Sequence, residues 1–201
     1  MPDEQRHDDL GLMRRCADGD RRAFDRLVAA HAPALTAMLR GILHNDAAAE
    51  DALQDTLLSA WKGADGFRGD ASVKTWLFTL ARHCAFRSQH LRAGEPRRFA
   101  DIDDLGQLGQ AAGWGDASFD PERAAALSES RSLLLKALST LTVEDREVIA
   151  IRDLGETSGP DAAAILGVPL ATMKTRLHRA RLKLVAAVRT SESHGGMTYG
   201  D

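Results

Sequence analysis

A short basic segment near the C-terminus carries the residue types that bind anions. Residues 170–189 read LATMKTRLHRARLKLVAAVR, and no Asp or Glu occurs between Asp161 and Glu192. A solvated amphipathic helix is the alternative, but such helices usually place an acid four residues from each base. The whole chain carries a net charge of −3, so its positive charge is concentrated here. This pattern predicts nucleic-acid binding.

Helical periodicity divides the basic segment into two faces. Leu170, Met173 and Leu177 begin an apolar stripe that we expect to pack inward. On the other side, the candidates for contacts to base edges are Lys174, Thr175, His178 and Arg179, and those for contacts to phosphates are Thr172 and Arg176. Arg181 and Lys183 either extend along the surface or contact phosphate late in the helix.

The composition predicts an all-α protein without an active site. Of 201 residues, 44% are apolar and only 5% aromatic, and Ala and Leu dominate. The seven histidines and the two cysteines, Cys16 and Cys84, have no metal-ligand or catalytic spacing, so we expect no enzyme, metal or cofactor. No apolar run approaches the roughly 20 residues that span a bilayer, and the polar N-terminus is not a signal peptide. We expect a cytoplasmic protein without membrane insertion.

Four helical patterns predict an N-terminal domain over residues 1–92. Their ranges are 10–30 with an interruption at Gly19, 33–43, a helix capped by Asp46, and a helix that starts after Ser72 and reaches residue 91. Residues 93–119 follow as a predicted flexible linker. Its composition is acidic and rich in Gly, because no Lys or Arg occurs between Phe99 and Glu122.

The second predicted domain covers residues 120–189. A helix starts at Pro121 and reaches about Ser139, and Thr142 and Ser158 cap the next two, over 143–153 and up to 166. Gly167 suits the left-handed position that ends a helix, and the basic segment follows it. Two helices joined in this way predict a helix-turn-helix. Residues 190–201 are predicted to be a disordered tail.

Several motifs in order resemble one family. LSTLTVEDREVIAIRDLGETSGPDAAAILGVPLATMKTRLHRARLKL resembles the C-terminal DNA-binding domain of the extracytoplasmic-function (ECF) group of the bacterial sigma-70 family. AEDALQDTLLSAWKG and FRGDASVKTWLFTLARHCA resemble the N-terminal core domain of that group. The resemblance implies two all-helical domains. The first binds the clamp helices of core RNA polymerase and opens the promoter −10 element, and the second reads the −35 element.

The resemblance also implies roles for N-terminal residues. Asp51, Gln54 and Asp55 match polymerase-contacting positions, although they also suit the start of a solvated helix. The candidates for the −10 strand are Phe67, Arg68, Arg82 and His83. Aromatic and cationic side chains suit single-stranded DNA, but burial in the core is the alternative for the aromatic residues. His83 stands where the family often has Asn, beside the pocket for a flipped base.

The most plausible function is therefore promoter recognition for core polymerase under the control of an anti-sigma factor. One alternative is a stand-alone helix-turn-helix regulator, which would bind duplex DNA without polymerase and usually as a dimer. Another is a decoy that sequesters a regulator, which the basic segment disfavours. Neither a dimerisation helix nor a ligand pocket is evident in the sequence.

Overall fold

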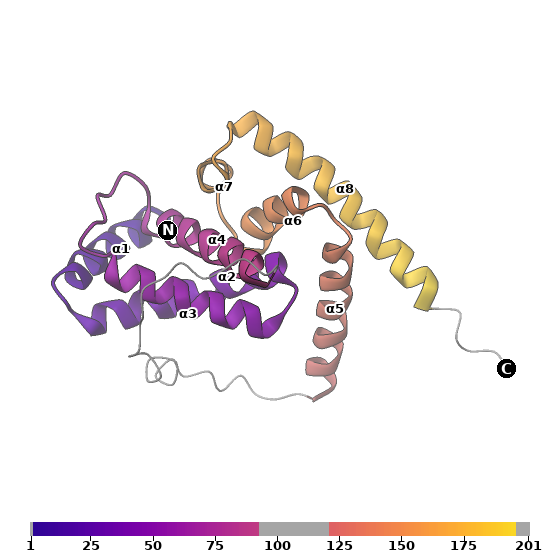
Figure 1. Cartoon of the computed structure of the whole chain (residues 1–201), viewed down its shortest axis with the longest axis horizontal. Coiled ribbons are helices and arrows are strands. Elements are labelled where there is room, and N and C mark those ends of the chain that lie inside the picture. The colour runs from indigo at the N-terminus through magenta and orange to yellow at the C-terminus, as the bar shows by residue number, and fades with distance from the viewer. Residues whose placement is uncertain (1, 93–120, 196–201) are drawn as a thin grey trace.

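A computed structural model describes residues 2–92 and 121–195, and every regular element in these ranges is a helix (Figure 1). The N-terminal half contains α1 (Pro2–Ala17), α2 (Arg21–Leu43), α3 (Asp46–Lys62) and α4 (Val73–Arg92). The C-terminal half contains α5 (Pro121–Ser139), α6 (Val143–Ile149), the π-helix η1 (Ala150–Leu154), α7 (Gly159–Leu166) and α8 (Leu170–Gly195). The all-α prediction is confirmed. The predicted linker, 93–119, lies outside the described residues.

The first two helices differ from their predicted bounds. The interruption at Gly19 is real: this residue has φ +84°, and Asp20 caps α2 by accepting a hydrogen bond from the backbone N–H of Ala23. However, α1 starts at Pro2, and α2 continues through Pro33 to Leu43, so the separate helix predicted from Pro33 was wrong. Proline costs an interior helix one hydrogen bond. Its site on α2 is exposed, while the opposite face is completely buried.

The caps of the other helices largely follow the sequence. Asn45, rather than the predicted Asp46, caps α3 by accepting from Ala48 N at 2.8 Å. Ser72 accepts from Thr75 N at 3.0 Å, and Thr142 and Ser158 serve α6 and α7 as predicted. A side-chain oxygen at each of these positions satisfies a backbone donor that the first helical turn leaves without a partner.

Two C-terminal elements differ from the prediction. The helix predicted over 143–153 is α6 followed by η1, which widens the turn before Gly155, whose N–H donates to Ala150 O at 2.8 Å. The basic helix α8 continues to Gly195. Residues 190–195 are therefore helical, not part of a disordered tail, and the rest of the predicted tail lies outside the described residues.

The two halves pack against each other around a continuous core. In Figure 1, α5 to α8 lie along one side of the α1–α4 bundle. Helix α2 packs on α6 and η1, and α4 packs on α7, whereas α8 lies outermost and packs on α5, α6 and α7. Phe78 of α4 and Ile151 of η1 are both fully buried in this core. Burial of apolar surface stabilises the arrangement by about 25 cal/mol per Å².

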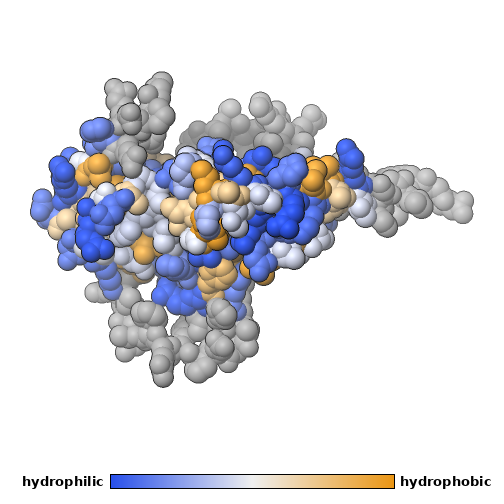
Figure 2. Space-filling view, turned by 90° about the horizontal axis from the view of Figure 1, so that it is seen from above, coloured by the Kyte–Doolittle hydropathy of each residue, from blue (hydrophilic) through white to orange (hydrophobic). Residues whose placement is uncertain are grey.

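One face of the molecule mixes hydrophilic and hydrophobic residues. Figure 2 shows hydrophobic residues in small patches separated by hydrophilic ones on the face seen from above. Leu182 and Val185 on α8 are the most exposed large apolar side chains of the described residues. Within the described ranges, no helix is long and apolar enough to cross a membrane.

Candidate nucleic-acid interface

The exposed face of α8 presents the candidate base-reading residues. Gly167, with φ +68°, ends α7 and turns the chain into α8. Met173, Leu177 and Ala180 anchor α8 on the core, with 1%, 8% and 0% of their surfaces exposed. The expectation that Leu170 packs inward with them was wrong, since this first residue of α8 is 37% exposed. The anchored stripe leaves the opposite side chains in solvent. Those exposed are Thr172, Lys174, Thr175, His178 and Arg179, and Arg176 is half-buried at the edge.

The cations of α8 fall into two groups that the sequence did not separate. Arg181 donates to both carboxylate oxygens of Asp153, at 2.6 and 2.9 Å, and Lys183 donates to Asp145. From the sequence, Arg181 and Lys183 were expected to extend along the surface or to contact phosphate, but acids of η1 and α6 neutralise them in this structure. By contrast, Lys174, Arg176 and Arg179 form no ion pair with any residue in the described ranges. The unneutralised charge thus lies in the N-terminal half of α8.

The acid that neutralises Lys183 is itself tuned by its surroundings. Burial opposes ionisation of Asp145, but hydrogen bonds from Lys183 and Thr142 outweigh it and keep the pKa of Asp145 below its usual 3.8. Asp145 and Asp153 are 38 and 28 residues distant from their partners in the chain. Only the folding of α6 and η1 against α8 brings these charges together.

The candidate −10 residues do not form one open surface. Phe67 packs against Trp76 with ring centroids 5.3 Å apart and is half-buried, whereas Arg68 and His83 are exposed. Arg82 lies over the Phe86 ring at 4.9 Å and donates to Glu147 of α6 at 2.5 Å. The loop residues and His83 are therefore accessible in this arrangement, but the guanidinium of Arg82 is engaged by the C-terminal half.

Other residues of α4 also meet the C-terminal half. Lys74 donates to the backbone oxygen of Glu156 at 2.8 Å, and burial lowers the pKa of its ammonium. Thr75 donates to Asp161 at 2.9 Å. Phe78 is completely buried, against Gly155. Sequence reasoning missed Glu147 and Lys74, and no local signal marks them, because their partners come from distant helices.

The acidic surface of α3 matches its prediction in placement. Asp51, Gln54 and Asp55 are exposed, because the buried stripe of α3 runs through Ala52 and Thr56. Asp55 lies 3.7 Å from Arg87 of α4 and keeps 58% of its side-chain surface exposed. The three side chains thus form one accessible polar surface on the outside of the N-terminal half.

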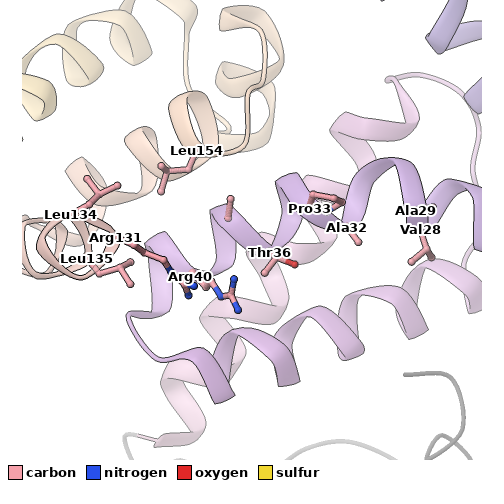
Figure 3. Close-up of a pocket in the computed structure, with 11 residues that line it drawn as sticks. Val28, Ala29, Ala32, Pro33, Thr36, Arg40, Arg131, Leu134, Leu135 and Leu154 are labelled. Atoms are coloured by element: carbon pink, nitrogen blue, oxygen red, sulfur yellow. The ribbon is translucent and has the colours of Figure 1, made fainter. Parts of the chain in front are cut away.

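An open groove of about 610 Å³ separates α2 from α5 (Figure 3). Pro33 and Thr36 line it from α2, and Leu134 and Leu135 line it from α5. Its walls are mostly apolar, and no Asp, Glu, His or Lys lines it that could act as a base on the Thr36 hydroxyl. Moreover, the described residues contain no cluster of His, Cys, Asp or Glu that could hold a metal ion. Nothing in this groove indicates catalysis.

Comparison with known families covers both halves of the chain. The family model for Sigma-70 region 2 matches residues 27–94, and the model for Sigma-70, region 4 matches residues 131–184. The RNA polymerase sigma factor NccH of Alcaligenes xylosoxydans xylosoxydans is 30% identical over 92% of this chain and 96% of its own length. The chain belongs to the ECF group of the sigma-70 family. Sigma factors direct core RNA polymerase to promoters, so core polymerase and promoter DNA are the partners of this sigma factor.

Further similarities support the group and the fold. The ECF RNA polymerase sigma factor SigM of Mycobacterium tuberculosis (strain ATCC 25618 / H37Rv) is 33% identical over 88% of this sigma factor and 82% of its own length. The structure of CnrH in complex with the cytosolic domain of CnrY has a TM-score of 0.66 at 29% identity, and covers 91% of this chain and 98% of CnrH. RpoE in complex with the anti-sigma factor NepR from Bartonella quintana has a TM-score of 0.60 at 27% identity. The similarity covers 83% of this chain and 96% of RpoE.

Proposed function

We propose that this sigma factor reads the −35 element with the N-terminal half of α8. The observation that carries the assignment is the division of charge on α8: Lys174, Arg176 and Arg179 form no ion pair within the described residues, although Arg179 acts on Asp145 at longer range, and Thr172, Thr175 and His178 stand exposed between them. Side chains of these types reach base edges and phosphates from a helix in the major groove. The phosphates then supply the missing negative charge.

We further propose that the N-terminal half supplies the other two surfaces. Asp51, Gln54 and Asp55 would contact the clamp helices of core polymerase, since an exposed acidic surface suits a basic partner. Phe67, Arg68, Arg82 and His83 would contact the −10 strand. The protein would act in the cytoplasm as a regulator of transcription rather than an enzyme.

We also propose that an anti-sigma factor controls this protein. Support comes from two structural neighbours whose titles name such complexes, CnrH with the cytosolic domain of CnrY and RpoE with NepR. Both neighbours align over most of this chain, so a partner of that class can meet a comparable surface.

The decisive experiment is run-off transcription with core polymerase on a library of promoters with randomised sequence. The wild-type protein should select one −35 and one −10 motif. A variant with Lys174→Glu and Arg179→Glu should lose the −35 preference. The matched control is Arg21→Glu with Arg22→Glu on α2, which changes the net charge by the same amount at exposed sites. This control should keep the −35 preference.

A second experiment distinguishes a sigma factor from a stand-alone regulator. A gel shift with and without core polymerase shows whether the purified protein selects duplex DNA alone. Sequence-specific binding without polymerase, together with no promoter-dependent transcript, would refute the proposed function.

A further inference from the structure

One face of α4 is held by the C-terminal half at three successive turns. Lys74, Phe78 and Arg82 are four residues apart and therefore share this face. Lys74 donates to Glu156 O at 2.8 Å, Phe78 is completely buried, and Arg82 donates to Glu147 at 2.5 Å. We call these three residues with their partners the α4 interface. Polar and apolar contacts alternate along the α4 interface. The contacts therefore match only when α4 and the C-terminal half are aligned in one register.

The ion pair at the end of the α4 interface is well shielded. Glu147 keeps 4% of its side-chain surface exposed and Arg82 keeps 22%. Arg82 Nε and Nη2 approach the two carboxylate oxygens at 2.5 and 3.5 Å. Charge-assisted hydrogen bonds of this type gain strength where water is excluded. The carboxylate of Glu147 therefore occupies the guanidinium of Arg82 in the way that a phosphate would.

Backbone shape brings the two halves close enough for this contact. A Cβ atom on Gly41 of α2 would lie 2.6 Å from Leu154 Cδ1 and 3.1 Å from Ala150 Cβ. A Cβ on Gly155 would lie 2.4 Å from Phe78 Cε1. Real Cβ atoms do not approach other atoms so closely, so glycine at both positions permits the packing. The closed arrangement thus has a steric basis that is independent of the ion pair.

We propose that the C-terminal half blocks the −10 surface of α4 within the free chain, with Glu147 taking the place of DNA on Arg82. This inference rests on the proposed function, because it assumes that Arg82 contacts the −10 strand. Glu147 occupies Nε and Nη2 of Arg82, so a phosphate cannot take the same bidentate edge of the guanidinium while Glu147 is in place. The two halves must therefore separate before α4 can use Arg82 on DNA, whereas the exposed α3 surface stays available to polymerase throughout.

Two variants of the full chain open the interface by different means. Glu147→Gln removes the charge that holds Arg82. Gly41→Leu puts a bulky side chain where Leu154 and Ala150 pack, and leucine is favourable in the α2 helix itself. The matched control is Asp153→Asn, which breaks an ion pair with Arg181 inside the C-terminal half and leaves the α4 interface intact.

Opening is measured as a distance between spin labels on the free protein. Asp65→Cys and Ala186→Cys place the labels at exposed sites of the two halves, and the native cysteines are buried. Loss of one charge-assisted hydrogen bond corresponds to roughly a tenfold rise in the open population. We expect such a rise in both variants and none in Asp153→Asn. Unchanged distances in both variants, with helix content retained, would overturn the proposal.

Binding of a fluorescent random-sequence single-stranded 20-mer tests the role of Glu147 directly. The measurement uses a Lys174→Gln, Arg179→Gln background, which weakens binding by α8. We expect Glu147→Gln to tighten binding several-fold, and adding Arg82→Gln to abolish that gain. A lengthened distance without tighter binding would refute the competition between Glu147 and DNA. Failure of the wild-type protein in run-off transcription would instead refute the proposed function and leave the distance result standing.

Discussion

The division of charge on α8 makes a quantitative prediction about salt dependence. Lys174 and Arg179 form no ion pair in the part of the chain that the structure describes, whereas Arg181 and Lys183 are neutralised by Asp153 and Asp145. Replacing each pair by glutamine removes the same formal charge from the same helix. Only the first replacement should remove cations that release counter-ions from DNA, because the second pair is already neutralised within the protein.

The expected magnitude follows from counter-ion release. Each phosphate neutralised contributes about −0.9 to the slope of log K against log salt, so Lys174→Gln with Arg179→Gln should flatten the slope by about 1.8. Between 50 and 200 mM salt, the wild-type protein should therefore lose about 12-fold more affinity than this variant. The variant with Arg181→Gln and Lys183→Gln should stay within about 0.5 of the wild-type slope.

The assay is fluorescence anisotropy of a random-sequence 30-base-pair duplex titrated with the full chain at four salt concentrations. A random sequence suffices because the electrostatic contribution does not depend on sequence. Circular dichroism checks that both variants keep their helix content. Equal flattening of the slope by the two variants would show that the ion pairs with Asp145 and Asp153 do not persist in the complex. No flattening by the first variant would refute the placement of DNA on this face.

Three further predictions concern stability, each measured by urea unfolding. Burial and then the charge of Arg146 lower the pKa of His44 from 6.5 to about 4, so the unfolded chain takes up this proton first as the pH falls. Stability should be full above pH 6.5 and decrease toward pH 4, by on the order of 1 kcal/mol after solvent screening; a His44→Gln variant that keeps the same decrease would contradict this. Gly167→Ala should destabilise the folded protein by about 1 kcal/mol because the φ of Gly167 is +68°. The control Gly11→Ala in α1 should stabilise it by up to about 1 kcal/mol, and the added Cβ has no atom within 4 Å at either position. Equal effects of the two substitutions would refute the argument from backbone conformation. Leu39→Ala, at a completely buried site, should cost about 2–5 kcal/mol, and a loss below 1 kcal/mol would mean that the core closes over the cavity.

Local sequence signals predicted most helix ends correctly. Ser72, Thr142 and Ser158 cap the helices that their types indicated, and Gly167 adopts the left-handed conformation. These features are decided within four residues of chain, so the sequence expresses them directly. Pro33 shows the limit of local reasoning, since the buried face of α2 outweighs the break that proline favours.

For the candidate surfaces, the sequence predicted the exposure of some residues correctly and of others wrongly. The periodicity of α8 placed its two faces correctly from Met173 onward, because the stripe of Met173, Leu177 and Ala180 sets the rotation of the helix. It was wrong for Leu170, which was expected to pack inward and is 37% exposed at the start of the helix. The same reasoning could not place Arg82, whose surroundings come from α6. An exposed position on one isolated helix says nothing about a second helix that packs over it.

The sequence by itself determined the all-helical fold, most of the caps, the basic face of α8 and the family, since these depend on residue types at short spacing. Only the tertiary structure decided which charges remain free. Asp145, Glu147 and Asp153 lie 38, 65 and 28 residues from the bases that they neutralise. An electrostatic partner is set by distance in space, and the packing of α6 and η1 on α2, together with that of α8 on α6, creates that proximity.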